Sequence, residues 1–321
     1  MTTKCNICGN EKNNSIIDVK ERILKDKREV FHYMQCGRCG AVMLQDRIDD
    51  FAKWYPSDYN PYHKRKEKQS ITSIIKRTIE FEQIIRMHGD GEREQFQKVL
   101  GGMKECDILL KRMFGTNIKR KNSLVDIGCG DGHWLDYLYE MGYHNITGVD
   151  LFTPEEQTKG VKWKFIKGDI FSLHERYDYV VLNHSFEHMD NPQAVIKQIK
   201  KIMNPNAICI ISIPVANGMA YKKYKENFAQ FDAPRHVYLH TKKSMEVLCN
   251  NAGLRIRNIL YDSNGAIWQL SELMSNCDDT LEELYKKIRR NGCKKQYYSL
   301  ASKSNIRGTG DQAIFYLTKN K

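Results

Sequence analysis

A glycine-rich turn between a strand and a helix constrains this 321-residue chain more than any other feature. Residues 124–127 (LVDI) have the pattern of a short buried strand, residues 128–132 (GCGDG) that of a turn, and residues 133–141 that of an amphipathic helix. A second apolar strand, residues 146–149, ends in Asp150. Glycines let a ligand approach the backbone where the helix begins, and a carboxylate at the next strand end is placed for ribose hydroxyls. The pattern predicts a Rossmann-like α/β domain with a nucleotide-type cofactor.

The spacing of the glycines also limits which cofactor fits. A dinucleotide fingerprint would require a third glycine at position 133, which is a histidine. Residues 125–132 (VDIGCGDG) resemble the first motif of class I S-adenosylmethionine-dependent methyltransferases, and the resemblance extends over roughly residues 120–262. It implies a seven-stranded methyltransferase sheet and S-adenosylmethionine as the cofactor.

The resemblance also implies where the cofactor lies. Gly128 and Gly130 would face its methionine part, and Asp126 would lie near its amino group. Asp150 would bind the ribose hydroxyls, and Asp169 matches the position that usually contacts the adenine amino group. The full set of expected cofactor contacts is Asp126, Gly128, Gly130, Asp150, Leu151, Asp169, Ile170 and Asn183.

The other strands of such a sheet follow in order. Between the sixth and seventh strands, residues 268–305 are expected to be helical, and the resemblance implies that the seventh strand is inserted antiparallel. A helix over residues 192–203 and a turn at residues 204–206 precede the fifth strand. We expect the third strand at residues 165–170, the fourth at 177–182, the fifth at 207–214, the sixth at 254–261 and the seventh at 311–318.

Four of the ten cysteines form two pairs with the spacing of a zinc site. Two residues separate Cys5 from Cys8, and two separate Cys36 from Cys39. This gap lets both thiolates of a pair reach one ion, and two pairs supply the four tetrahedral ligands that structural zinc prefers. The sequence therefore predicts a structural zinc ion. Two unrelated cysteine pairs, or a redox-active pair, are the alternatives.

The chain is expected to contain three parts. Residues 1–50 would form a zinc ribbon, with strands at residues 16–19 and 29–34 between the cysteine pairs. Residues 51–118 would form a connector followed by a helical segment, because apolar residues recur there at helical spacing. Residues 119–321 would form the methyltransferase domain.

Three histidines are candidates for a general base. Methyl transfer to a hydroxyl requires removal of its proton, and neutral histidine is the usual base near pH 7. His184 and His188 lie in residues 183–192 (NHSFEHMDNP), which resemble the Glu-His-x-x-x-Pro segment of methyltransferases acting on small hydroxylated molecules such as quinones and sugars. His236 lies in residues 232–236 (DAPRH), which resemble methyltransferases of bacterial surface-polysaccharide pathways. We rank His236 ahead of His188.

The same segments allow other interpretations. Residues 184–188 match the H-x-x-E-H zinc-protease signature, but that motif requires a long helix and here follows a strand end directly. A divalent ion held by the histidines beside the acceptor is a second alternative. Arg235 would either hold a phosphate or carboxylate of the acceptor or pair with Asp232.

The predicted function is methyl transfer from S-adenosylmethionine to oxygen on a small sugar-like molecule or polysaccharide precursor. The chain has 51 Lys and Arg residues against 39 Asp and Glu, a net charge of +12 that attracts polyanions. A rival function is therefore methylation of RNA or protein, with the zinc ribbon and basic surface docking a polyanion. A third alternative retains the cofactor fold only as a non-catalytic binding module.

The sequence also indicates where the chain resides. It contains no run of 18 or more apolar residues, and its first residues form no apolar signal core. We therefore expect no membrane span and a cytoplasmic location, where reduced thiols are available to bind zinc.

Overall fold

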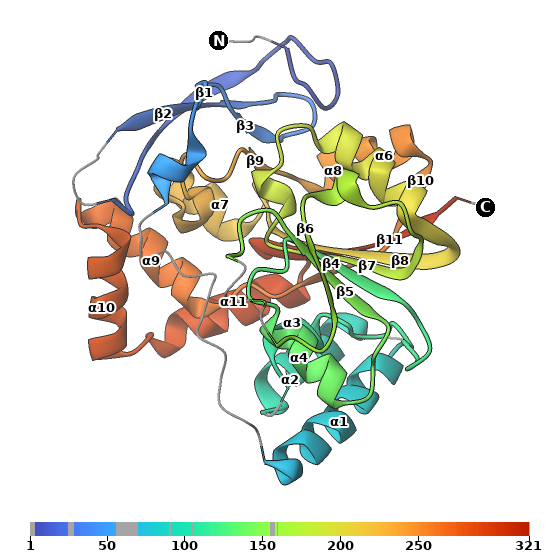
Figure 1. Ribbon diagram of the computed structural model, residues 1–321. Coiled ribbons are helices and arrows are strands. Elements are labelled where there is room, and N and C mark those ends of the chain that lie inside the picture. The colour runs from blue at the N-terminus through green and yellow to red at the C-terminus, as the bar shows by residue number, and fades with distance from the viewer. Residues whose placement is uncertain are drawn as a thin grey trace.

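Seven strands of the described residues form the larger of two sheets, in the spatial order β10-β11-β8-β7-β4-β5-β6 (Figure 1). The computed structural model describes residues 4–24, 29–55, 70–89, 91–104, 106–154, 158 and 160–320. Strand β11 pairs antiparallel with β8 and β10, whereas the other pairs are parallel, which confirms the expected arrangement. The strands are β4 (Leu124–Ile127), β5 (Ile146–Asp150), β6 (Lys164–Lys167), β7 (Tyr177–Asn183), β8 (Met203–Pro214), β10 (Leu254–Tyr261) and β11 (Gln312–Lys319).

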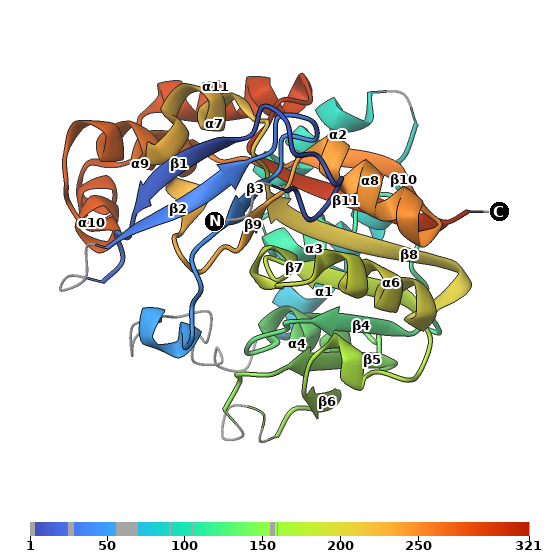
Figure 2. The same cartoon turned by 90° about the horizontal axis from the view of Figure 1, so that it is seen from above.

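Helices cover both faces of this sheet because side chains alternate along each strand. In β7, Val180 and Leu182 belong to the core on one face, and Val181 belongs to the core on the other. Helices α6 (Pro192–Ile202) and α8 (Lys242–Ala252) pack on the first face (Figure 2). The second face is covered by α1 (Ile71–Arg86), α2 (Glu92–Gly102), α3 (Ile108–Lys111) and α4 (His133–Glu140).

The second sheet joins the N-terminal part of the chain to a distant segment. Its order is β1-β2-β3-β9, with all pairs antiparallel. Strands β1 (Ser15–Lys20), β2 (Val30–Gln35) and β3 (Val42–Leu44) come from the cysteine-containing part. Strand β9 (Tyr238–Leu239) comes from the connection between β8 and α8. The expected strands at 16–19 and 29–34 are present, and β9 completes a sheet that the sequence assigned to residues 1–50 alone.

The remaining elements lie in the connections between the strands and helices named above. None of the described helices is both long and apolar enough to cross a membrane. The elements are α7 (Met219–Tyr224), α9 (Gly265–Asn276), α10 (Leu281–Asn291), α11 (Lys295–Ile306) and the short 3-10 helices η1 (Phe51–Trp54), η2 (Ile170–Ser172), η3 (Phe186–His188), η4 (Lys225–Asn227) and η5 (Ala229–Phe231).

The structure differs from the expected elements in a few places. The turn expected at residues 204–206 was wrong, because β8 already begins at Met203 and these residues form an irregular part of its pairing with β7. The expected third strand is shorter: β6 ends at Lys167, and Asp169 caps η2 instead. The part of the expected connector and helical segment at residues 56–69 lies outside the described residues.

Candidate active site

The glycine loop after β4 lies directly against the segment that follows β7. Gly128 has φ +75°, and a Cβ atom there would lie 2.6 Å from the Cβ of Ser185. A side chain at this position would displace one of the two segments. Gly130 also has a positive φ, and its N–H donates to Oδ2 of Asp150 at 3.0 Å. Glycine is therefore required at residue 128 by space as well as by conformation.

Asp150, at the end of β5, fastens this loop to the sheet. Its Oδ1 accepts from the backbone N–H groups of Phe152 and Thr153, at 2.8 and 2.7 Å. Its Oδ2 accepts from Gly130, and the side chain is largely buried. The sequence pattern predicted a ribose-binding acid here but not this bracing of the loop, which needs the two strands to be adjacent.

Near the glycine loop, strands β4 and β7 carry buried polar atoms that have no hydrogen-bond partner within the described residues. Trp134 donates from Nε1 to Oδ2 of Asp126 at 2.7 Å, whereas Oδ1 of Asp126 has no partner among the described residues. Burial, with a smaller contribution from the charge of Asp150, raises the pKa of Asp126 to about 7. The amide oxygen and nitrogen of Asn183, on the adjacent strand β7, also lack partners within the described chain. Buried groups of this kind fit a ligand with complementary polar atoms.

The remaining expected cofactor contacts lie at the ends of β5 and β6. Asp169 accepts from the N–H groups of Phe171 and Ser172 as the cap of η2. Leu151 is 51% exposed at the end of β5. The side chain of Ile170 is buried in the core, so residue 170 could contact a ligand only through its backbone.

His184 is held on both ring nitrogens. Its Nε2 lies 3.2 Å from the guanidinium of Arg112 and 2.6 Å from the amide nitrogen of Gln312. Arginine can only donate, so Nε2 of His184 accepts, and Nδ1–H donates to Oε1 of Glu187 at 3.2 Å. The lone pair that a base would use is therefore occupied by Arg112, a residue that sequence reasoning did not single out.

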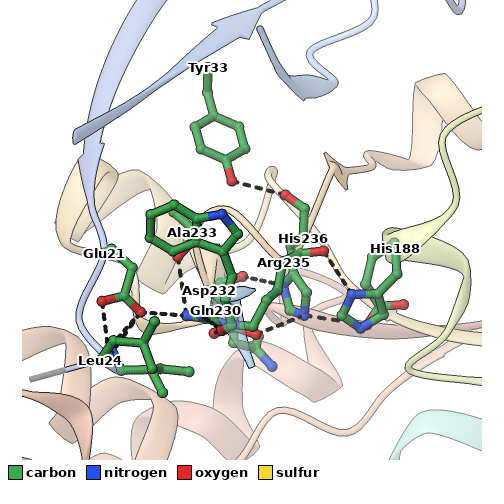
Figure 3. A network of polar contacts seen from close by, with 12 residues as sticks. Glu21, Leu24, Tyr33, His188, Gln230, Asp232, Ala233, Arg235 and His236 are labelled. Carbon is green, nitrogen blue, oxygen red and sulfur yellow. Dashed lines mark hydrogen bonds and ion pairs between the residues drawn. The ribbon is translucent and has the colours of Figure 1, made fainter. Parts of the chain in front are cut away.

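His188 and His236 have a different arrangement (Figure 3). We call Nε2 of each ring open, because no hydrogen bond to it is found within the described residues. Nδ1 of His188 lies 2.8 Å from the carbonyl oxygen of Arg235, and Nδ1 of His236 lies 2.9 Å from that of Gln230. A carbonyl only accepts, so both Nδ1 atoms carry a proton, and in the neutral form of either ring Nε2 is an acceptor. The ring centres lie 4.8 Å apart.

Glu187 is the buried charge beside this histidine pair. One of its oxygens lies 3.9 Å from Nε2 of His236, and side-chain ligand atoms of Glu187, His188 and His236 all lie within 4.8 Å of one another. Burial opposes ionisation of Glu187, but the hydrogen bond from His184 and the nearby imidazoles lower its pKa to about 2. Burial, reinforced by His236, lowers the pKa of His188. The site thus combines an ionised carboxylate with a neutral imidazole.

The guanidinium of Arg235 makes its contacts within the protein interior. Its side chain is fully buried, and it pairs with Asp232 at 2.9 Å and with Glu21 of the N-terminal part at 3.0 Å. Of the two roles left open by the sequence, pairing with Asp232 is the one observed. The pairing with Glu21 was not foreseen, because the two residues lie far apart in the sequence.

The four cysteines of the N-terminal part converge on one point. Sγ of Cys5 lies 3.7 Å from Sγ of Cys39, and Sγ of Cys8 lies 3.6 Å from Sγ of Cys36. A tetrahedral zinc ion with bonds of about 2.3 Å would separate its sulfur ligands by about 3.8 Å. The four side chains therefore fit a zinc ion, and this cysteine set leaves no coordination position for a substrate.

Comparison with known proteins identifies related enzymes. The ubiquinone biosynthesis O-methyltransferase of Rickettsia conorii is 25% identical over 181 residues, which cover 49% of this chain and 60% of that protein. The malonyl-acyl-carrier-protein O-methyltransferase of Halalkalibacterium halodurans is 31% identical over 104 residues, covering 28% and 38%. The chain thus spans three fifths or less of the length of these two relatives.

Two solved structures are similar to the chain at low sequence identity. The cyclopropane synthase MmaA2 of Mycobacterium tuberculosis has a TM-score of 0.43 and 12% identity, covering 79% of this chain and 100% of that one. A protein described as a methyltransferase of Bacillus halodurans has a TM-score of 0.44 and 14% identity, covering 66% and 98%.

The match to a protein family covers the part of the chain that contains the parallel strands, the glycine loop and the acids at the strand ends. Residues 99–259, half of the chain, match a family described as Methyltransferase domain. The matched residues include β4, β5, β6, β7 and β8, the parallel strands whose carboxyl ends carry the glycine loop, Asp126, Asp150 and Asn183. The chain belongs to this family, the class I S-adenosylmethionine-dependent methyltransferases.

Proposed function

We propose that the protein transfers a methyl group to a hydroxyl oxygen of a small, sugar-like acceptor, such as a polysaccharide precursor. The observation that carries this proposal is the pair of open Nε2 atoms on His188 and His236 beside the ionised Glu187. The O-methyltransferase names of the relatives support an oxygen acceptor. The sugar-like class is supported by the sequence resemblance of residues 232–236 to methyltransferases of polysaccharide pathways.

In this proposal the cofactor is held at the ends of β4, β5 and β7. S-adenosylmethionine supplies a methyl group on a sulfonium whose sulfur leaves as a neutral thioether. Asp126 and Asn183 would bind its polar groups with their unpartnered atoms, and Asp150 would bind its ribose hydroxyls. Leu151, Asp169 and the backbone at Ile170 would enclose its remaining part.

The histidines would remove the proton of the acceptor hydroxyl. We rank His236 first and His188 second, because each has an open Nε2, and we rank His184 last because Arg112 occupies its Nε2. Glu187 lies 3.9 Å from Nε2 of His236 and would stabilise the imidazolium that forms there. The backbone carbonyls of Gln230 and Arg235 hold the Nδ1 protons and orient both rings.

Single replacements of His236, His188 and His184 test the roles. With a panel of sugar and nucleotide-sugar acceptors, loss of the true base should reduce turnover by about 100-fold or more while cofactor affinity stays near the parent value. His174, an exposed histidine outside the site, provides the matched control. Parent-like turnover in both His236→Gln and His188→Gln would contradict a histidine base.

We also propose that Cys5, Cys8, Cys36 and Cys39 bind one structural zinc ion per chain, on the basis of their sulfur separations. The alternative in which a divalent ion beside the acceptor replaces the histidine base predicts a second metal ion per chain. Metal analysis before and after dialysis against a chelator, combined with turnover measurements, separates the two cases.

A second candidate function is methylation of a polyanion such as RNA. A cleft of about 1170 Å³ lies between the N-terminal part and helices α7 and α8. Its lining includes Arg38, Lys222, Lys225 and Lys243, for which no ion pair is found within the described residues. Retention on RNA that weakens steeply with salt, and that is lost on replacing these four residues, would favour this function over a small acceptor.

A further inference from the structure

The segment that carries His236 is bonded to the cysteine-containing part along most of its length. We call residues 232–241 the histidine loop and residues 4–24 and 29–44 the ribbon. Tyr33 of the ribbon donates from its hydroxyl to the carbonyl of His236 at 3.0 Å. The backbone N–H of Leu44 donates to the carbonyl of Val237, and β3 pairs with β9 in the next two residues. Ribbon residues thus contact the carbonyl of the histidine and the residues that follow it.

The zinc-binding end of the ribbon takes part in the same contact. Thr241, at the end of the histidine loop, donates from Oγ1 to the carbonyl of Cys39 at 2.6 Å. The same Oγ1 accepts from the N–H of Ser244 and caps helix α8. This hydrogen bond therefore joins the cysteine cluster to the histidine loop.

The strongest link is a buried network of charges centred on Arg235 (Figure 3). Its guanidinium contacts Glu21 of the ribbon at 3.0 Å and Asp232 of the loop at 2.9 Å, and it also donates to the carbonyl of Trp54. The side chains of Arg235 and Glu21 are fully buried. Burial raises the pKa of Glu21, although the charge of Arg235 opposes this, and the 3.0 Å contact places the carboxyl oxygen directly against the guanidinium. Removing Arg235 would leave the carboxyls of Glu21 and Asp232 without this guanidinium, and removing Glu21 would leave Arg235 paired with Asp232 alone.

Arg235 connects this network to both open imidazoles. Its own carbonyl accepts the Nδ1 proton of His188, and His236 is the next residue in the chain. Asp232, which pairs with Arg235, also lies 3.8 Å from Nε2 of His236. The residue with this buried side chain therefore contacts one ring through its own carbonyl and precedes the other ring in the chain.

We infer that Glu21 and Arg235 are positioning residues, through which the ribbon fixes the placement of His188 and His236. This assignment gives the ribbon a role in methyl transfer that involves no contact with the substrate. A misplacement of about 1 Å can reduce a rate about 100-fold, so small shifts of the loop matter. The effect on turnover rests on the proposed function, whereas the placement of the rings can be measured separately.

The experiment compares Glu21→Gln and Arg235→Lys with Arg22→Gln in the full chain. Arg22 also joins the ribbon to the rest of the protein, through the carbonyls of Met274 and Cys277, but it does not touch the histidine loop. Tyr33→Phe is a milder variant that removes one hydroxyl and so guards against a failure to fold. Each protein is measured for turnover, for S-adenosylmethionine affinity by calorimetry, and for the imidazole nitrogens by NMR.

We expect Glu21→Gln and Arg235→Lys to lower kcat by about 10- to 100-fold while cofactor affinity stays within about twofold. The Nδ1 signals of His188 and His236 should change in the same variants and in Tyr33→Phe, but not in Arg22→Gln. Parent-like imidazole signals in Glu21→Gln, Arg235→Lys and Tyr33→Phe would overturn the inference, as would equal changes in Arg22→Gln. If the parent protein methylates no hydroxyl, the proposed function fails. The NMR measurement still shows whether Glu21 and Arg235 fix the placement of the two imidazole rings.

Discussion

The indole N–H of Trp134 donates to one oxygen of the Asp126 carboxylate at 2.7 Å, and the other oxygen has no partner among the described residues. Burial raises the pKa of this carboxyl to about 7. Near neutral pH the carboxyl of Asp126 is therefore partly protonated, and a nearby positive charge would favour its ionised form. The amino group of S-adenosylmethionine would supply that charge, because an α-amino group stays protonated up to about pH 7.7.

The affinity for S-adenosylmethionine should rise between pH 6 and pH 7.5. Ionisation of Asp126 across this range strengthens its attraction for the cofactor's ammonium group. Below the pKa of Asp126, the affinity should rise by at most about tenfold per pH unit. Calorimetry at four pH values measures the slope. Asp126→Asn retains an acceptor for Trp134 but cannot ionise, so it should show a flatter profile; equal slopes in both proteins would exclude Asp126 as the titrating group.

Without cofactor, the same carboxyl should have the opposite effect on stability. A pKa raised from 3.8 to about 7 means that the folded protein binds more protons than the unfolded chain within that range. The contribution of Asp126 to the free energy of unfolding should therefore be greatest below about pH 4 and decrease as the pH rises towards 7. Urea unfolding of the parent and of Asp126→Asn isolates this contribution, which is present only in the parent.

Replacing Gly128 with alanine should weaken cofactor binding and destabilise the protein. The added Cβ would lie 2.6 Å from the Cβ of Ser185, and φ is +75°, so both space and backbone conformation oppose it. Gly101→Ala in helix α2 is the matched control, because no atom lies within 4 Å of its added Cβ. That variant should be stabilised by about 0.5–1 kcal/mol. Calorimetry measures the cofactor affinity of both variants, and thermal unfolding measures their stability. Equal affinity and equal stability in Gly128→Ala and Gly101→Ala would refute the prediction.

Asp150→Ala should reduce both cofactor affinity and the order of the glycine loop. The carboxylate accepts from Gly130, Phe152 and Thr153, and hydrogen bonds to a charged group contribute about 1.5–3 kcal/mol each. Asp150→Asn keeps one acceptor oxygen and should show an intermediate loss. Hydrogen exchange at residues 128–132 reports the loop independently of binding, and unchanged exchange in Asp150→Ala would show that the bracing contacts are not needed.

The purified protein should contain one zinc ion per chain when chelators are avoided. Cys5→Ser should lose the ion and unfold at a lower temperature, because structural zinc stabilises the folded state. Cys277→Ser is the control, since Cys277 lies outside the cysteine cluster and contacts Leu273 and Asp279 instead. Elemental analysis with much less than one zinc per chain in the parent would contradict the assignment.

Local patterns were enough to predict the centre of the fold. The apolar run of residues 124–127, the glycines after it and the acid at residue 150 are close in sequence, and each has a direct physical requirement. The four cysteines were found for the same reason, because two-residue gaps are visible without knowing the fold. The ranking of the histidines relied on resemblance rather than on geometry.

Contacts between distant segments could not be predicted in this way. Strand β9 has two residues, too few for an alternating pattern, so nothing in the sequence indicated its pairing with β3. Glu21 looks like an ordinary surface charge, and Arg235 was expected to bind the acceptor or pair with Asp232, but nothing in the sequence indicated that the fold buries Glu21 and Arg235 together. Likewise, the engagement of His184 by Arg112 requires α3 to lie beside the carboxyl end of β7.

The pairing of β3 with β9 has a consequence during synthesis on the ribosome. About 190 residues separate Leu44 from Tyr238, so the edge of β3 is made long before its partner strand exists. At ordinary rates of translation, this edge stays uncovered for roughly 10 to 40 s. An open strand edge invites pairing with other chains. Early capture of the proposed zinc ion by the four thiolates would shape the nascent segment during this interval, and the yield of folded protein would then depend on the supply of zinc.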